Sequence, residues 1–187
     1  GSKALYDFLS YQGVKVEEQD IAVLALTIDI LNDIVKPEGN PKVIKNSLYA
    51  LSKAAQFFGL QLYPVKLSQG LSPSNLSGST LKGTIPANIT PFIAHLKGDH
   101  FVLVTRISGE KIYYLDEHKE EFLPLEKFLK QFSGYMLIIK QQETPLSISS
   151  GLARVSPVDN KGTVSAFIPV PDAEARKILG AKSNKQG

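Results

Sequence analysis

Histidines are the side chains of this sequence best suited to chemistry, and there are three of them, His95, His100 and His118. The sequence contains no cysteine, so these residues can form no disulfide, no thiolate metal site and no thiol nucleophile. An imidazole changes its charge near neutral pH and can act as a general acid or base. The first thing to establish is which histidine has a partner suited to that role.

A predicted β-hairpin brings one histidine close to a carboxylate. Residues 100–107 and 111–116 are predicted strands, joined by a turn at 108–110. Any short turn places Asp116 opposite His100 to within two or three residues, so the two side chains are neighbours if they share a face. An aspartate beside a histidine can fix the imidazole tautomer and stabilise the imidazolium. This is the base half of a nucleophile–base–orienter triad.

Interpretations without catalysis remain open for the same residues. His100 would then only begin a strand, and Asp116 would end the neighbouring one. Asp99 is a second candidate orienter, but in an extended chain its side chain points to the face opposite that of His100, so it is expected to serve the turn. His118 lies in a charged run where a solvated loop histidine is expected, and His95 could face either the core or the surface.

Metal and serine chemistry have less support. The histidines and nearby carboxylates do not have a spacing typical of a zinc site, so neither a metal nor another cofactor is expected. No serine stands in a Gly-x-Ser-x-Gly setting, and Ser77 and Ser79 lie in a predicted flexible loop. A serine hydrolase is therefore poorly supported.

The spacing of apolar residues predicts helices first and strands afterwards, with a period near four giving way to a period of two. Helices followed by antiparallel strands are typical of an α+β domain. The predicted helices cover residues 3–12, about 21–31, 46–59 with Asn46 as the cap, and 125–132; the predicted strands cover 60–66, 91–96, 100–107, 111–116 and 134–140; a Ser/Gly/Pro-rich loop covers 68–88.

Length and composition predict one globular domain with an appendage. The chain has 187 residues, 43% of them hydrophobic, and a formal charge of +3 from interspersed basic and acidic residues. That charge is too weak to indicate a nucleic-acid partner. No apolar run approaches the roughly 20 residues that span a bilayer, and the start of the chain does not resemble a signal peptide.

The composition changes near residue 140. Residues 141–187 are rich in Ser, Pro and Lys and are predicted as a C-terminal extension or linker, whereas 1–140 form the domain. Within the extension, 163–170 has a strand-like pattern and 172–179 a helix-like pattern. The extension is not expected to bury much apolar surface by itself.

The predicted catalytic half resembles a known family. The segment 91–104, PFIAHLKGDHFVLV, followed sixteen residues after His100 by Asp116, resembles the C39 double-glycine peptidases. In that pattern a Gly-x-His-Phe-Val-Val-like strand carries the catalytic histidine, and a later strand ends in the catalytic aspartate. Family members usually have Asp-Pro at the second site, and here Glu117 replaces the proline. Segments 47–60 and 123–135 are also similar, so the resemblance covers roughly residues 3 to 140.

The resemblance implies a fold and a mechanism. The fold would be the papain-like cysteine peptidase fold, with N-terminal helices followed by a twisted antiparallel sheet. The activity would be hydrolysis of bacterial leader-type peptides after Gly-Gly-type small residues, with His100 and Asp116 in a Cys-His-Asp triad. The family's cysteine stands at the start of the first helix, preceded by an oxyanion-hole glutamine. Gly1 aligns best with the residue just after that cysteine, so the nucleophile is absent from this chain.

Two explanations of the missing cysteine lead to different functions. In the first, the chain derives from a cysteine peptidase whose nucleophile precedes Gly1, and it is inactive as it stands. Alternatively, it is a non-catalytic peptide-binding module similar to the C39-like domains of certain toxin exporters. A structural or adaptor role would be favoured if the residues after Lys140 closed the cleft. The compartment stays open, because exporter-fused relatives act on the cytoplasmic side and stand-alone ones can be extracytoplasmic.

Overall fold

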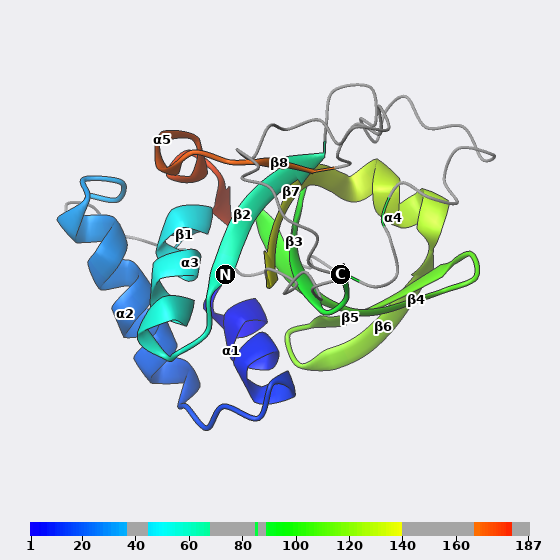
Figure 1. The fold of residues 1–187 in the computed structure, drawn as a ribbon, viewed down its shortest axis with the longest axis horizontal. Helices are drawn as coiled ribbons and strands as arrows, with labels where there is room; N and C mark the ends of the chain where they lie inside the picture. Colours follow the sequence, from blue (N-terminus) through cyan, green and yellow to red (C-terminus); the bar gives the residue numbers. More distant parts are fainter. Residues whose placement is uncertain (37–44, 68–84, 86–88, 140–166, 181–187) are drawn as a thin grey trace, which may run out of the picture.

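The computed structural model describes residues 1–36, 45–67, 85, 89–139 and 167–180. Three N-terminal helices lie together on one side of a twisted antiparallel sheet, as Figure 1 shows, and this confirms the predicted α+β papain-like class. The helices are α1 (Ser2–Tyr11), α2 (Glu18–Leu31) and α3 (Leu48–Phe57), followed late in the chain by α4 (Leu125–Gln131) and α5 (Asp172–Ala175).

Seven strands form the main sheet, in the order β6-β5-β4-β3-β7-β2-β8. Each neighbouring pair in this sheet is antiparallel, and the small strands β1 and β9 form a separate antiparallel pair. The strands are β1 (Asn46–Ser47), β2 (Leu62–Leu67), β3 (Phe92–Leu96), β4 (His100–Ser108), β5 (Lys111–Asp116), β6 (Lys119–Pro124), β7 (Phe132–Ile139), β8 (Phe167–Pro169) and β9 (Leu179–Gly180).

The sheet has a hydrophobic core on each face. Phe101 and Leu103 of β4 pack with the three N-terminal helices, whereas Val102 and Val104 of the same strand pack with Phe128 of α4. Because successive side chains of a strand alternate between faces, a buried run in β4 is what a two-sided sheet requires. The strand that begins with His100 is therefore held from both sides.

The third helix begins one residue later than predicted. Its N-cap is Ser47, whose Oγ accepts a hydrogen bond of 2.9 Å from the Ala50 amide, and Asn46 belongs to β1. Asparagine and serine are both good caps, and the side-chain oxygen must reach the amide two or three residues on. Ser47 reaches Ala50, which is the third residue after it.

Strand β6 was not predicted. It follows β5 after a two-residue turn in which Glu117 and His118 both have positive φ, at +50° and +68°. Such turns usually contain Asn-Gly or Asp-Gly, and the charged Glu-His pair does not carry that signal. The structure also explains the missing proline of the family pattern, because a proline ring holds φ near −65° and could not occupy the position of Glu117.

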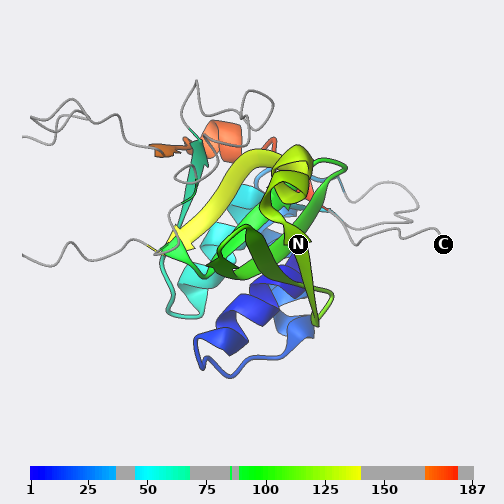
Figure 2. The ribbon, with the colours of Figure 1, turned by 90° about the vertical axis from the view of Figure 1, so that its right-hand side faces the viewer.

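The described part of the C-terminal region returns to the domain. Strand β8 pairs with β2 at the edge of the main sheet, helix α5 follows, and β9 pairs with β1 (Figures 1 and 2). Val170 and Ala175 are buried in the core formed by the N-terminal helices. The helix-like pattern corresponds to α5, which is shorter than expected. The strand-like pattern overlaps β8, and its first part, 163–166, lies outside the described residues. The predicted loop at 68–88 lies outside the described residues except for Ile85.

Candidate functional site

His100 and Asp116 are hydrogen-bonded. The distance from His100 Nε2 to Asp116 Oδ1 is 2.8 Å, and the two side chains are 16% and 8% exposed. A carboxylate oxygen accepts, so the Nε2 atom carries a proton and donates it in this bond. The proximity expected from the hairpin is therefore present.

A β-bulge makes this contact possible. The turn end of the hairpin pairs Ser108 with Lys111, and an unbroken register would place Asp116 opposite Leu103, on the face away from His100. The register instead shifts between Val104 and Arg106, so that Leu103 pairs with Leu115. In this register Asp116 comes opposite Val102, which lies two positions from His100 and has its side chain on the same face of the sheet.

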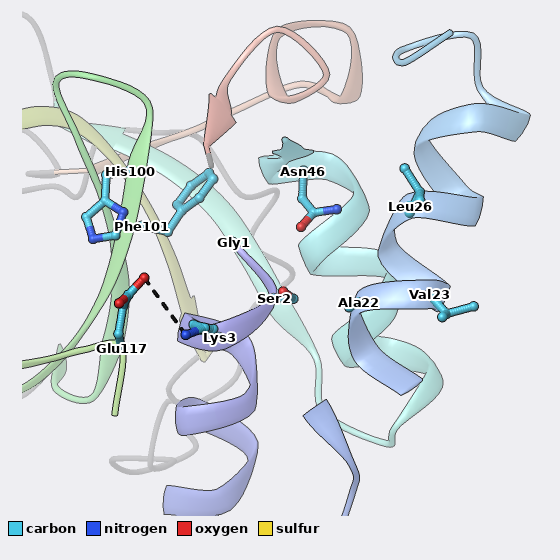
Figure 3. Close-up of a pocket in the computed structure, with 10 residues that line it drawn as sticks. All are labelled: Gly1, Ser2, Lys3, Ala22, Val23, Leu26, Asn46, His100, Phe101 and Glu117. Atoms are coloured by element: carbon cyan, nitrogen blue, oxygen red, sulfur yellow. Dashed lines mark ion pairs between the residues drawn. The ribbon is translucent and has the colours of Figure 1, made fainter. Parts of the chain in front are cut away.

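The histidine lines a pocket that also contains the start of α1. The pocket has a volume of about 240 Å³. Figure 3 shows Gly1 between the strand that carries His100 and the small strand that carries Asn46. The lining residues are Gly1, Ser2, Lys3, Ala22, Val23, Leu26, Asn46, His100, Phe101 and Glu117.

The walls of this pocket differ in chemistry. Side chains of α2 give an apolar wall, with Val23 as its most exposed member. Across from it, Lys3 Nζ lies 3.9 Å from Glu117 Oε1, the ion pair drawn in Figure 3. An imidazole, a helix N-terminus and an apolar wall can together hold a segment of peptide and stabilise negative charge near the first turn of α1.

Asp99 does not orient His100. Its Oδ2 accepts a bond of 2.6 Å from Lys45 Nζ, and its backbone has a φ of +61° in the turn between β3 and β4. The residue lies in the turn, as predicted, and its side chain binds Lys45, outside the turn. The ion pair also connects the turn to the residue that precedes β1.

His95 is buried, with only 7% of the residue exposed. Burial lowers the pKa of its imidazole, which favours the neutral form. Nε2–H donates to the Leu179 carbonyl at 3.0 Å, and Nδ1 lies 2.8 Å from the hydroxyl oxygen of Ser133, whose proton goes to the His95 carbonyl. His95 therefore faces the interior and contacts the C-terminal segment.

His118 has two carboxylate partners that the sequence pattern did not indicate. Its Nδ1 lies 2.5 Å from Asp7 Oδ1 and its Nε2 lies 3.1 Å from Glu18 Oε2, so both ring nitrogens donate and the ring is an imidazolium. The hydrogen bond to Asp7 is the main cause that raises the pKa of His118. The residue lies in an exposed turn, as expected, but the turn is bound to α1 and α2. These partners are more than 90 residues away in sequence, and no local pattern identifies them.

Asp29 is a second buried carboxylate that the sequence analysis missed. It is fully buried on α2 and accepts hydrogen bonds from the Ser47 amide at 3.0 Å and the Ser47 hydroxyl at 2.5 Å. Burial raises the pKa of this carboxyl. The aspartate holds β1, and with it Asn46, at the edge of the pocket. Its position one helical turn after the buried Ala25 places it on the buried face of α2, and this spacing is the sequence signal that could have identified it.

Two further observations concern the described residues alone. They contain no cluster of three or more His, Cys, Asp or Glu side chains that could hold a metal ion. None of their helices is both long and apolar enough to span a membrane.

Comparison with known proteins gives one family and several similar structures. The model of the Peptidase C39 family matches residues 12–144. A solved double glycine motif protease from an AMS/PCAT transporter, in complex with the leader peptide, is 20% identical with a TM-score of 0.49, over 73% of this chain and 80% of that one. The N-terminal peptidase C39 like domain of a toxin secretion ATP-binding protein from Vibrio parahaemolyticus is 18% identical with a TM-score of 0.50, over 75% and 95%. Among curated proteins, no sequence matches.

Proposed function

The chain belongs to the peptidase C39 family, and from this premise we propose that it is the body of a cysteine peptidase domain that cleaves leader-type peptides after small residues. His100 is the general base and later the general acid, and Asp116 orients it. The nucleophilic cysteine precedes Gly1 in the parent protein. The 187 residues contain no cysteine, so we expect them not to hydrolyse peptides by themselves.

One observation carries this proposal. Gly1, the N-cap of α1, lines the same pocket as His100, which is bonded to Asp116. A thiol on the residue before Gly1 would therefore stand at a helix N-terminus and beside an imidazole. Backbone amides and a neighbouring imidazolium both lower the pKa of a thiol, and the thiolate is the attacking species.

The reaction follows from these positions. The thiolate attacks the carbonyl carbon of the scissile peptide bond, and His100 gives a proton to the amine that leaves. His100 then takes a proton from a water molecule, which hydrolyses the thioester and releases the peptide acid. Asp116 keeps the ring in one tautomer throughout.

The test is peptidase activity of the chain extended at its N-terminus by its native upstream residues. Gly-Gly-ending leader peptides are the substrates, and cleavage is followed by mass spectrometry. We expect cleavage that falls by at least about 10³-fold in His100→Ala, because the base of the triad is lost. Ser108→Ala, at the exposed far end of the same strand, is the control and should cleave at the unchanged rate. Equal cleavage by His100→Ala and the unchanged chain would contradict the assignment.

A second function is favoured by the complete absence of cysteine from the chain. In this case the domain binds the same peptides in the same pocket and does not cut them. Saturable peptide binding by the extended chain without any cleavage would establish this function in place of the first.

A further inference from the structure

The C-terminal segment 178–180 is bound to the domain as a short extended strand. Gly180 pairs with Asn46 and Leu179 pairs with Ser47, in antiparallel orientation. The Leu48 amide donates a hydrogen bond of 2.8 Å to the Ile178 carbonyl. Main-chain pairing of this kind is how an extended peptide is held on an exposed strand.

The position of Gly180 admits glycine only. A Cβ atom on this residue would lie 2.2 Å from Cδ2 of Phe101 and 3.3 Å from the carbonyl oxygen of Asp99. The residue is buried, so a larger side chain could not turn into solvent without moving the strand. The segment therefore lies in a slot shaped for a residue without a side chain.

This slot adjoins the pocket that contains His100. Both Asn46 and Phe101, which flank Gly180, also line that pocket. Strand β9 runs past Ser47 first and Asn46 second, so its C-terminal end points toward the pocket. The segment is also anchored from the sheet, because His95 Nε2 donates to the Leu179 carbonyl at 3.0 Å.

We propose that residues 178–180 occupy the domain's peptide-binding site as a tethered ligand, and that this site takes an extended peptide with glycine at the position of Gly180. The proposal rests on the proposed function, since it assigns the slot beside His100 to the peptide that this domain binds. The C-terminal segment and an external peptide then compete for the same strand edge.

The competition predicts how much the apparent dissociation constant of an external peptide changes when the segment is released. A tethered segment acts at a high effective concentration, which favours the filled site. The apparent dissociation constant of an external peptide is its intrinsic value divided by the fraction of molecules with an empty site. If nine molecules in ten are filled, release of the segment strengthens external binding about tenfold.

The experiment measures binding of a fluorescent nonapeptide with the sequence of residues 174–182, EARKILGAK, by anisotropy. Gly180→Val should bind it at least about tenfold more tightly than the unchanged 187-residue chain, because the segment is expelled. Lys177→Ala is the matched control, since this exposed residue lies in the same segment and outside the slot. A chain ending at Lys177 provides a second released form that keeps α5 and its core contacts.

A second probe tests the slot itself. The same peptide with valine in place of its glycine should bind the chain ending at Lys177 at least about tenfold more weakly, the loss expected when one favourable contact becomes a clash. The proposal is overturned if the chain ending at Lys177 binds no more tightly than the full chain, or if it binds both peptides equally.

Two further results distinguish failure of the proposed peptidase function from failure of the tethered-ligand proposal. Peptide binding that depends on the segment, without any cleavage by the extended cysteine-bearing chain, would keep the tethered ligand and remove the peptidase. Cleavage at equal rates with and without residues 178–187 would keep the peptidase and overturn the tethered ligand.

Discussion

At the scale of single residues, the bond between His100 Nε2 and Asp116 Oδ1 determines which ring nitrogen of the neutral imidazole carries the proton. The aspartate receives the Nε2 proton, so in the neutral ring Nδ1 is the nitrogen that can take a proton from a reacting group. The carboxylate is nearly buried, which strengthens its electrostatic effect on the ring. The pair has the geometry of a base and its orienter.

Asp116→Asn tests the role of the orienter in the extended, cysteine-bearing chain. An amide can donate to Nε2 and so stabilise the tautomer with its proton on Nδ1. We expect kcat to fall by roughly 10²–10⁴-fold with a smaller change in KM, as for the corresponding change in other triads. Steady-state kinetics of both chains would measure kcat and KM. An unchanged kcat would show that the aspartate only supports the strand.

Asp29 acts on the site through the backbone of β1. Its two bonds to Ser47 hold the N-cap of α3 and the strand that borders the pocket. Asp29→Ala leaves a buried amide and hydroxyl without their acceptor, so we expect the free energy of unfolding to fall by about 2–4 kcal/mol. Urea denaturation measures this loss. Thr27→Ala, on the exposed face of the same helix, should change it by less than about 0.5 kcal/mol.

At the scale of elements, the turn between β5 and β6 is fastened to two helices by one imidazolium. The ring of His118 bonds to Asp7 of α1 and to Glu18 of α2, and it meets the ring of Tyr6 edge-on at 5.3 Å. The same turn carries Glu117, which lines the pocket. A charge on His118 therefore helps to hold the sheet against the start of the helical half.

The pH dependence of stability follows from the direction of the His118 shift. The pKa is about 6.5 in an unfolded chain and is raised in the folded one, chiefly by the hydrogen bond to Asp7. The stabilisation is therefore complete below that unfolded value and is lost as pH rises through the folded pKa. We expect His118→Asn to be less stable than the unchanged chain at pH 5.5, with a difference that shrinks toward pH 9.

Urea denaturation of both chains at several pH values measures this difference. Because the histidine is partly exposed, added salt should reduce the difference at every pH below the folded pKa. A difference that grows as the pH rises would show that the charged ring does not stabilise the fold.

At the scale of the whole molecule, some features could be predicted from the sequence because they are local. The spacing of apolar residues is enough to identify α1, α2 and α3 and the strands that carry the His100–Asp116 pair. The bulge between Val104 and Arg106 could not be predicted, since it is a backbone irregularity that no residue type in this strand marks. The partners of His118 also depend on contacts between segments far apart in the chain.

The C-terminal return is the largest feature that local patterns did not reveal. Its described strands are two or three residues long, and they pair with residues of β1 and β2 that lie 100 or more residues earlier. A short strand gains stability mainly from the surface it covers, and that surface is assembled only in the folded domain. Composition therefore indicated an extension, whereas packing joins residues 167–180 to the domain.

Stepwise truncation measures how much this segment contributes to the whole. A chain ending at residue 166 loses β8, the buried Val170 and Ala175, and the ion pair between Lys66 and Glu174. A chain ending at Lys177 keeps all of these. We expect the shorter chain to unfold with a free energy about 3 kcal/mol lower than that of the longer one, mostly from the lost apolar burial. Equal stability of the two chains in urea would mean that β8 and α5 cover the domain without supporting it. The expected loss would make the segment from β8 to α5 a structural part of the fold, distinct from residues 178–180, which we propose compete with a peptide.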